Sequence, residues 1–499
     1  MRYKPFLLLI CISALQITIL MQYKINLEIY FNTKNKLTIQ SSENDSWNTT
    51  WGGSDIEHTY ALAMDSNGNI YIAGETHSFY TRDYSIFLLK YSGSGEKLWY
   101  RVWGGNRKCY FHALTIDSSD NIYITGSTNF GWPTSTDMLL LKFSSSGDLE
   151  WDIIWGGDSW EKGYAVVSDS SNNVYVSGFT DSYGPGLTGI YLLKFNSAGD
   201  LLWEVTWGGD KADYARRLEI DASDNIYVLG ETNSYGSGSK DVCLLKFNSH
   251  GVLQWNQTWG GSNTEVLKSL KLDSSNNIYV LGEIRKTQDV DIFLLKYDQS
   301  GNFQWSMLWG GNRTDYPRAL NIDSSDNIYV AGDMYNYDTR YHDIFLLKIN
   351  YSGEIQWDFC WKKGERSSGS SVTFDIDDNI YVVGEYYSYE FASLDLLVLR
   401  LNNIGKLTGY IVWGGKDREY GSEIIIDAHG NLYIAGETFS YGSGRSDVFL
   451  LKNPSITQVY PPAVRTKFGI WVNLLGAICG ILCWVVLYFH KNRRKIVLK

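Results

Sequence analysis

An internal repeat constrains this chain of 499 residues more than any other feature. Trp-Gly-Gly begins at seven places and an eighth Trp precedes Lys-Lys, which marks Trp51, Trp103, Trp155, Trp207, Trp259, Trp309, Trp361 and Trp413. Six of the seven intervals are 52 residues and one, from Trp259 to Trp309, is 50. If position n denotes the nth residue after the tryptophan, position 14 is always Asp, 18 Asn, 20 Tyr and 23 Gly. The chain is therefore built from one supersecondary unit used eight times.

Each unit is expected to form four short strands. In the unit that begins at Trp103, alternation and turn residues predict strands at 114–116, 122–126, 138–143 and 149–155, with an Asx-type turn at 117–121. No helical period is long enough for a crossover helix. Four antiparallel strands in a repeat of this length are typical of one blade of a β-propeller.

The two ends of the repeat array predict how the ring closes. Six fourth strands carry a Trp four residues before the next repeat tryptophan, and Trp47 holds this place although no unit precedes it. The last unit stops after 448–452 without a fourth strand. The first strand should complete the last blade and remove the open edges. We therefore expect an all-β, eight-bladed β-propeller over residues 44–452. Gly409 replaces one expected Trp, which predicts a less well filled joint.

Hydrophobic segments at both termini predict a membrane protein. Residues 1–21 place Arg2 and Lys4 before an apolar run, the layout of a signal peptide or an uncleaved signal anchor helix, and 22–43 would be a linker. Residues 453–468 would be a juxtamembrane linker, 469–489 a transmembrane helix and 490–499 a basic tail. The positive-inside rule then places the tail in the cytoplasm and the propeller outside, at the cell membrane.

Charge and motif content exclude several functional classes. The formal net charge is −11, which argues against a nucleic-acid partner. No nucleophile elbow, zinc-protease motif or phosphate loop occurs in the sequence. Six cysteines at unrelated spacings and seven scattered histidines form no metal or redox motif. The sequence therefore favours a protein that is not an enzyme and that has no organic cofactor.

Four sequence stretches follow one another in the same order along the units. They are Trp-Gly-Gly, Leu-x-Ile-Asp-Ser-Ser-x-Asn-Ile-Tyr-Val-x-Gly-Glu-Thr, Asp-x-Phe-Leu-Leu-Lys and Ser-Gly-x-Leu-x-Trp. From Trp47 to Lys452 the chain resembles the SBBP-type β-propeller repeats of exported and cell-surface bacterial and archaeal proteins. The resemblance implies a propeller that serves as a surface scaffold, and it implies no shared chemistry.

Acidic residues recur at positions 6 and 24. Five units carry both, which gives the candidate metal ligands Glu57, Glu75, Asp213, Glu231, Glu265, Glu283, Asp315, Asp333, Glu419 and Glu437. Both positions are expected at loops on the same face of the ring. One interpretation is that these carboxylates accept backbone N–H groups, which must be paired when buried. The other is a ring of calcium sites, since hard cations prefer clustered carboxylate and carbonyl oxygens.

The loops between the second and third strands are the longest and most varied. They carry aromatic side chains among Ser, Gly and Asn, a composition typical of recognition surfaces. Ordinary loop packing is the alternative. The candidate binding residues are Trp132, Tyr335, Tyr337, Tyr341, Tyr386, Tyr387 and Tyr389.

The features together favour a membrane-anchored extracellular propeller that acts as a non-catalytic binding, adhesion or scaffold module. Its expected partners are the membrane, through the C-terminal helix, and an extracellular protein or glycan. Two alternatives remain: an extracytoplasmic enzyme acting on glycans as a hydrolase or lyase, and a scaffold for envelope assembly.

Overall fold

The computed structural model of the protein describes residues 46–454 and 457–458, apart from 80–82, 106, 130–134, 288, 312–313, 362–365 and 389–391. Within these residues the regular elements are all strands, and no helix is long and apolar enough to span a bilayer. The predicted segments 1–21, 22–43, 469–489 and 490–499 lie outside the described residues, as does most of 453–468.

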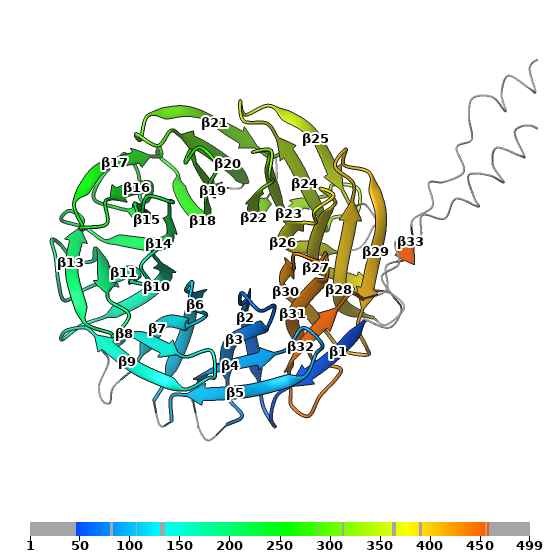
Figure 1. The fold of residues 1–499 in the computed structure, drawn as a ribbon. Helices are drawn as coiled ribbons and strands as arrows, with labels where there is room; N and C mark the ends of the chain where they lie inside the picture. Colours follow the sequence, from blue (N-terminus) through cyan, green and yellow to red (C-terminus); the bar gives the residue numbers. More distant parts are fainter. Residues whose placement is uncertain are drawn as a thin grey trace, which may run out of the picture. The chain divides into compact units, whose positions relative to one another are not determined.

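Eight antiparallel sheets are arranged in a ring around a central opening (Figure 1). The strands of blades one to four are β2 (Glu57–Met64), β3 (Ile70–Thr76), β4 (Ser85–Tyr91) and β5 (Lys97–Trp103); β6 (Cys109–Ile116), β7 (Ile122–Thr128), β8 (Asp137–Phe143) and β9 (Leu149–Trp155); β10 (Glu161–Ser168), β11 (Val174–Thr180), β12 (Gly189–Phe195) and β13 (Leu201–Trp207); β14 (Asp213–Ile220), β15 (Ile226–Thr232), β16 (Asp241–Phe247) and β17 (Leu253–Trp259).

The second half of the ring repeats this plan, and the predicted eight-bladed propeller is confirmed. The strands of blades five to eight are β18 (Thr264–Leu272), β19 (Ile278–Arg285), β20 (Val290–Tyr297) and β21 (Phe303–Trp309); β22 (Asp315–Ile322), β23 (Ile328–Tyr335), β24 (His342–Ile349) and β25 (Ile355–Cys360); β26 (Ser367–Phe374), β27 (Ile380–Ser388), β28 (Ser393–Leu401), β29 (Leu407–Trp413) and β33 (Thr457–Gln458); β30 (Glu419–Ile426), β31 (Leu432–Thr438), β32 (Asp447–Lys452) and β1 (Trp47–Trp51).

The burial of each strand follows from its place in the blade. The first strand of each blade borders the central opening and the fourth forms the outer rim (Figure 1). All seven positions of β3 and of β4 are buried because neighbouring blades cover both faces, whereas every position of β5 is exposed or half-buried. The core lies between blades: Leu62 and Ile70 of blade one cluster with Tyr433 and Leu450 of blade eight.

The ring closes as the sequence predicts. β1 pairs antiparallel with β32, from Trp47 opposite Lys452 to Trp51 opposite Val448, and so supplies the fourth strand of blade eight. Lys452 then donates its Nζ to the carbonyl oxygen of Gly93 in blade one, at 3.1 Å. The closure therefore joins the first and last residues of the array both within a sheet and across a joint.

The recurring outer-strand tryptophans pack against turn glycines of the next blade. Gly301 has φ +82°, and a Cβ on it would meet Cδ2 of Trp255 at 2.7 Å. Gly405 relates in the same way to Trp357, with φ +77°. A side chain at the turn would therefore occupy the place of the ring. These tryptophans serve packing between blades, which is how the repeat uses them.

The departure at Gly409 has a specific cause. Blade eight ends at Lys452 and has no hairpin turn between its third and outer strands, so there is no turn glycine for a Trp at 409 to cover. Instead β33 adds to the outer edge of blade seven, with Gly409 opposite Gln458 and Tyr410 opposite Thr457. The expected poorly filled joint is thus the place where a fifth strand pairs.

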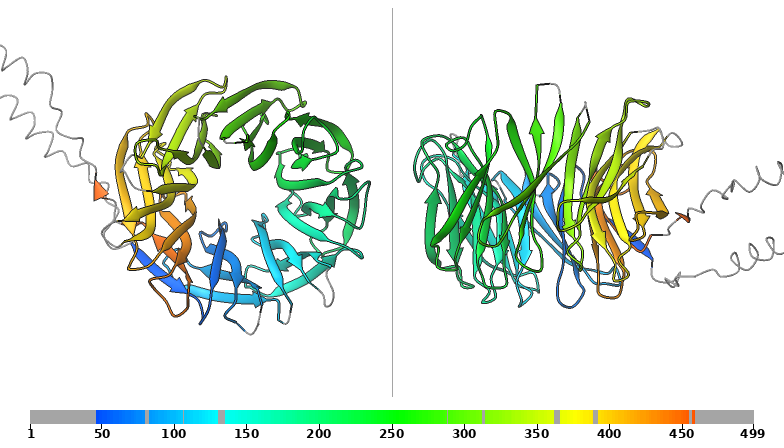
Figure 2. Two further views of the ribbon diagram at one scale, coloured as in Figure 1. Left: turned by 180° about the vertical axis from the view of Figure 1, so that it is seen from behind. Right: turned by 90° about the horizontal axis from the view of Figure 1, so that it is seen from above.

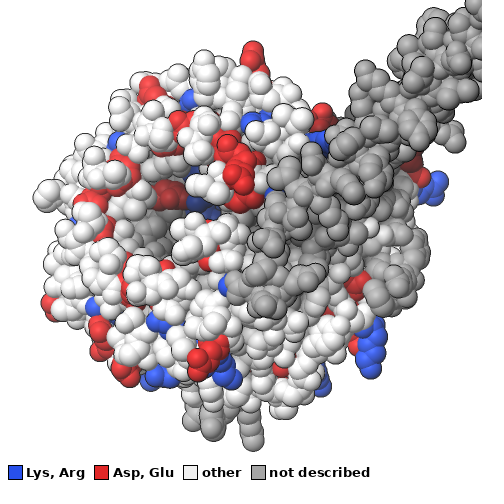
Figure 3. Space-filling view, turned by 45° about the vertical axis from the view of Figure 1, so that its right-hand side comes forward, with Lys and Arg blue, Asp and Glu red and all other residues white. Residues whose placement is uncertain are grey.

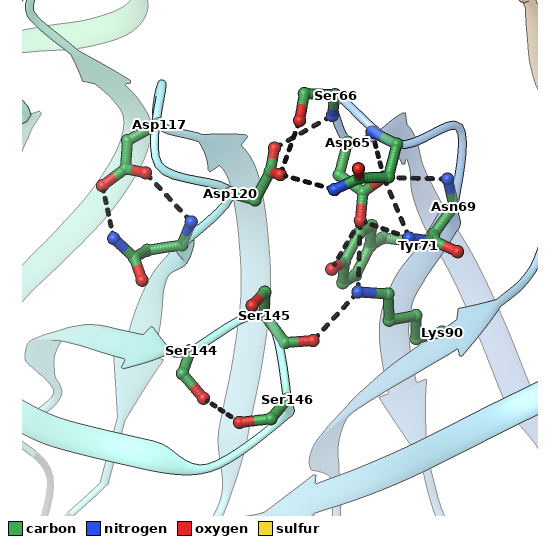
Figure 4. A network of polar contacts seen from close by, with 12 residues as sticks. Asp65, Ser66, Asn69, Tyr71, Lys90, Asp117, Asp120, Ser144, Ser145 and Ser146 are labelled. Atoms are coloured by element: carbon green, nitrogen blue, oxygen red, sulfur yellow. Dashed lines mark hydrogen bonds and ion pairs between the residues drawn. The ribbon is translucent and has the colours of Figure 1, made fainter.

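The invariant Asp and Asn fasten the turn between the first and second strands. In blade one, Asp65 Oδ1 accepts the N–H of Asn69 at 2.8 Å, and Asp65 Oδ2 accepts Tyr71 Oη at 3.2 Å and pairs with Lys90 Nζ at 3.1 Å (Figure 4). Lys90 also donates to the carbonyl oxygen of Ser145 in the next blade, at 2.9 Å. The conserved spacing within the repeat therefore secures both the turn and the joint.

Candidate functional site

The ring has two faces, seen edge-on in Figure 2. One face carries the loops between the second and third strands and the connections from one blade to the next, and we call it the loop face. It also holds the first residues of the inner strands, at position 6, and the last residues of the second strands, at position 24. Both sets of predicted ligands therefore lie at this face.

The position 6 carboxylates accept hydrogen bonds from their own blade. Glu57 Oε1 accepts from Thr76 Oγ1 at 2.8 Å, and Glu57 Oε2 accepts the N–H of Gly53 at 3.2 Å. Equivalent pairs of bonds hold Glu161, Asp213 and Glu419. Burial raises the pKa of Glu57, and the charge of Asp447 acts in the same direction.

The position 24 carboxylates are held by backbone N–H groups or by cations. Glu75 Oε1 accepts the N–H of Phe111 in blade two at 2.8 Å. In the later blades the partners are basic, with distances of 3.0 Å from Arg216 to Glu231, 3.2 Å from Lys268 to Glu283 and 2.9 Å from Arg318 to Asp333. Glu437 lies 3.2 Å from His58 and accepts the N–H of Thr59.

The strand register separates the two predicted ligands of each unit. Glu57 lies opposite Thr76, and Glu75 lies opposite His58. Because successive residues of a strand point to opposite sides, Glu57 faces blade eight whereas Glu75 faces blade two. The same register separates 213 from 231, 265 from 283, 315 from 333 and 419 from 437. Among the described residues there is no group of three or more His, Cys, Asp or Glu placed to hold a metal ion.

A different acidic residue, from the preceding blade, faces every position 6 carboxylate except Asp213, and sequence reasoning missed it. At or near the start of their third strands, five units carry an aspartate at position 34, and Asp291 holds the corresponding place in the shorter unit: Asp137, Asp241, Asp343, Asp395 and Asp447. A Cβ on Gly52 would overlap both Asp447 and Glu57, so these two carboxylates meet across the joint. The Asp of the recurring Asp-x-Phe-Leu-Leu-Lys stretch was the available signal.

Five of the predicted loop aromatics lie in the described part of the chain. Tyr335 makes an edge contact with Tyr337, at 5.5 Å between ring centroids, and Tyr337 and Tyr341 are 56% and 47% exposed. Tyr386 and Tyr387 belong to β27 and are half-buried. Trp132 and Tyr389 lie outside the described residues.

A further group of aromatics lines the inner strands of the first four blades, where the sequence analysis did not single them out. We call it the aromatic arc, and it consists of His58, Tyr60, Tyr110, His112, Tyr164 and Tyr214 at positions 7 and 9. The ring centroids of His112 and Tyr164 are 4.8 Å apart, and Phe179 bridges toward Tyr214 at 5.2 Å. Tyr60 is 48% exposed.

Charge distinguishes the two sides of the central opening. The Arg216 guanidinium lies over the rings of Tyr164 and Tyr214, at 4.9 and 5.3 Å from their centroids, and ends the arc. Burial lowers the pKa of His112 to about 4, so this imidazole is neutral at pH 7. Acidic and basic side chains are otherwise spread over the surface, and both colours are visible within the hollow in Figure 3. Position 9 is thus aromatic in blades one to three and basic in blades four to six.

Two of the three thiols in the described part of the propeller are poorly suited to nucleophilic chemistry. Cys109 and Cys243 are free and buried, and burial raises the pKa of each thiol above its usual range. A reactive cysteine needs thiolate character and access to solvent. Both residues therefore act as core side chains.

The comparisons with known proteins agree with this fold. The family model for the SBBP β-propeller repeat matches residues 103–131. An uncharacterized WD repeat-containing protein, L264, of Acanthamoeba polyphaga mimivirus is 25% identical over 202 residues, covering 30% of this chain and 14% of that protein. The regulatory protein FlaEY of Caulobacter vibrioides is 27% identical over 185 residues, a match that covers 32% of this chain and 19% of FlaEY. The matched regions thus span less than a fifth of either relative.

Among solved structures, that of a eukaryotic initiation factor is similar, with 8% identity and a TM-score of 0.43. The match covers 78% of this chain and 83% of the initiation factor chain. The repeat match falls within one of the eight units, and all eight units fold as blades of the same plan. The chain is an eight-bladed β-propeller that carries the SBBP β-propeller repeat.

Proposed function

We propose that the protein is a non-catalytic binding module, displayed on the outside of the cell, that holds an extracellular protein or glycan at its loop face. The observation that carries this proposal is the aromatic arc. At positions 7 and 9, six of the eight residues in the first four blades are tyrosine or histidine, against two of eight, Tyr316 and Tyr420, in the last four. Packing of the repeat does not require them. Aromatic rings with one free face and a polar group favour recognition of sugars and peptides.

A binding screen with a matched pair of variants tests this proposal. The full-length protein is applied to glycan and protein arrays, and the best ligand is titrated against Tyr60→Ala and Tyr351→Ala. Both tyrosines are exposed, at 48% and 68%, but Tyr351 lies in a turn on the face opposite to the arc. We expect at least a tenfold loss of affinity for Tyr60→Ala, about 1.4 kcal/mol, and no change for Tyr351→Ala. Equal loss in both variants would contradict a site at the arc.

Membrane attachment and orientation form the second part of the proposal. The sequence supports them through the apolar stretch 469–489, the basic tail 490–499 and the leader-like residues 1–21. Protease added to intact cells should remove the propeller and leave a small C-terminal fragment in the membrane. Full protection of the propeller would refute this orientation, and a mature chain that ends before 469 would establish a removable sorting tail instead.

The enzymatic alternative is tested on the same sample. A panel of glycosidase and polysaccharide-lyase substrates should give no turnover above that of a heat-denatured control. Reproducible turnover that Tyr60→Ala abolishes would make the arc part of an active site and would overturn the non-catalytic proposal.

A further inference from the structure

Blades four and five meet at two buried carboxylates. Asp241 begins β16, Glu265 lies at the start of β18, and each side chain belongs to a residue that is 2% exposed. Both approach Gly260, the first glycine of Trp-Gly-Gly, and a Cβ there would overlap Asp241 Oδ1 and stand 2.7 Å from Glu265 Oε2. The two oxygens therefore share the small space that glycine leaves at this position.

These two oxygens are the unsatisfied ones. Neither Asp241 Oδ1 nor Glu265 Oε2 has a hydrogen-bond partner among the described residues. The carboxylates are otherwise held by loop N–H groups, from Ser237 to Asp241 and from Gly261 to Glu265. Position 25, a threonine that donates to the position 6 carboxylate in blade one, is Ile284 in blade five. The loops thus fix both side chains with bare oxygens facing one another.

Two buried carboxylates that face one another repel unless a cation lies between them or one of them is protonated. In the joint between blades five and six the protein supplies a cation itself, because Lys286 Nζ bonds Asp291. The same carboxylate pairing, also centred on the first glycine, recurs at three other joints: Asp447 with Glu57, Asp137 with Glu161, and Asp395 with Glu419.

We propose that Asp241 and Glu265 bind a Ca²⁺ ion between blades four and five. At the other three joints the glutamate oxygen next to the glycine already accepts a backbone N–H, so the proposal is confined to this joint. The donors are hard carboxylate oxygens with no thiolate or imidazole among them, which favours Ca²⁺ over Zn²⁺. Loop carbonyl oxygens and water would complete the coordination. Two carboxylates in an exported domain fit the weak affinities, about 10⁻⁴–10⁻³ M, of extracellular calcium modules.

Direct ion binding tests the site on the full-length protein. After treatment with a chelator, wild type should melt at a higher temperature as CaCl₂ is added, and Tb³⁺ should give luminescence sensitised by Trp259, which precedes Gly260. Equilibrium dialysis with radioactive calcium should then count one ion fewer for the Asp241→Asn, Glu265→Gln double variant than for wild type. Superimposable melting curves with chelator and with calcium would overturn the proposal.

The control variant is Asp213→Asn. Asp213 holds position 6 in blade four, but the residue facing it at position 34 is Gly189, and its oxygens accept from Thr232, Ser234 and the N–H of Gly209. Its calcium count should equal that of wild type. The calcium site is refuted if the double variant binds as many ions as wild type. If, in addition, its melting temperature exceeds that of wild type by more at pH 8 than at pH 5, the two carboxyl groups of wild type share a proton.

Discussion

At the scale of single residues, the turn glycines show how little space separates adjacent blades. Gly301 and Gly430 both lie in turns with nearly the same backbone angle, φ +82° and +81°, but only Gly301 has a tryptophan against it. Alanine at Gly430 meets nothing within 4 Å, so it carries only the cost of a left-handed backbone. That cost is about 1–2 kcal/mol.

The two alanine variants therefore separate strain from collision. We expect Gly430→Ala to lower the free energy of unfolding by about 1–2 kcal/mol, and Gly301→Ala to lower it by about a further 1–3 kcal/mol because Trp255 must move. Urea denaturation of both proteins measures the difference. Equal losses of unfolding free energy would mean that Trp255 moves aside without cost. They would contradict the conclusion that the outer-strand tryptophans are tightly packed between blades.

Glu423 predicts a pH dependence that arises in the central opening. It lies on the inner strand β30, and burial raises its pKa to about 7 although Ser371, Lys271 and Arg217 act to lower it. Since the unfolded pKa is 4.5, this carboxyl favours folding below pH 4.5, and that contribution is lost as the pH rises through 7.

The matching variant is Glu423→Gln, which cannot ionise. Relative to wild type, its free energy of unfolding should be higher at pH 8 than at pH 5, by up to about 3 kcal/mol, since one pKa unit corresponds to about 1.4 kcal/mol. Denaturation at the two pH values gives the comparison. A difference between the two proteins that does not change with pH would show that Glu423 titrates normally.

Residue roles set by local spacing could be predicted from the sequence, and roles set by the joint could not. Asp65 and Asn69 were assigned to a turn because only four residues separate them, and their hydrogen bonds confirm it. The partner of Glu57 is Asp447, almost the whole array away in sequence. Whether Glu57 and Glu75 point to the same side of the blade depends on the strand register, which the sequence does not give. In the observed register they point to opposite sides.

At the scale of elements, β1 is the part of the ring whose removal is most informative. It supplies the outer strand of blade eight, and Trp51 is 6% exposed between Val448 of that strand pair and the rings of Phe79 and Phe87 in blade one. Deleting 46–51 leaves β32 with an unpaired edge and removes a buried Trp. The expected loss of stability is at least about 3 kcal/mol, with aggregation through the open edge.

The control is a chain that begins at Ser46, compared with a chain that begins at Gly52. Both lack residues 1–45, so the difference between them reports on β1 alone. Differential scanning calorimetry should show a lower melting temperature for the chain that begins at Gly52 than for the chain that begins at Ser46. Identical melting temperatures would contradict closure of the ring by this strand.

β33 is the element that the sequence could not predict. Its two residues lie beyond the last unit and share no repeat position, and what they pair with is the edge left at Gly409. The missing tryptophan was visible, but its meaning depended on the absence of a turn in blade eight. The missing tryptophan marks Gly409 as unusual, but it does not predict that β33 pairs there.

At the scale of the whole molecule, the number of blades followed from counting tryptophans, and the closure followed from one strand too many at the start and one too few at the end. The side chains at the central opening could not be predicted from the repeat. The repeat pattern describes what all blades share, whereas the aromatic arc consists of residues in which the blades differ. Position 9 is Tyr60, His112 or Tyr164 in the first three blades and Arg216, Lys268 or Arg318 in the next three.

The cores shared between blades predict that the ring unfolds as a unit. Each apolar cluster draws on two neighbouring blades, so no blade keeps a core when its neighbour melts. Thermal unfolding followed by tryptophan fluorescence and by far-ultraviolet circular dichroism should give one transition with the same midpoint. Two separate midpoints would show that part of the ring melts independently.

Pairing of β1 with β32 also fixes an order of events during synthesis. Trp47 leaves the ribosome well before its partner Lys452. At about 5–20 residues per second, the roughly 400 intervening residues take about 20–80 s to make. Throughout that interval seven blades can form while the eighth has no outer strand, and the nascent chain holds an amphipathic segment with nothing yet to pair with. The first strand therefore stays without its partner until β32 has been synthesised.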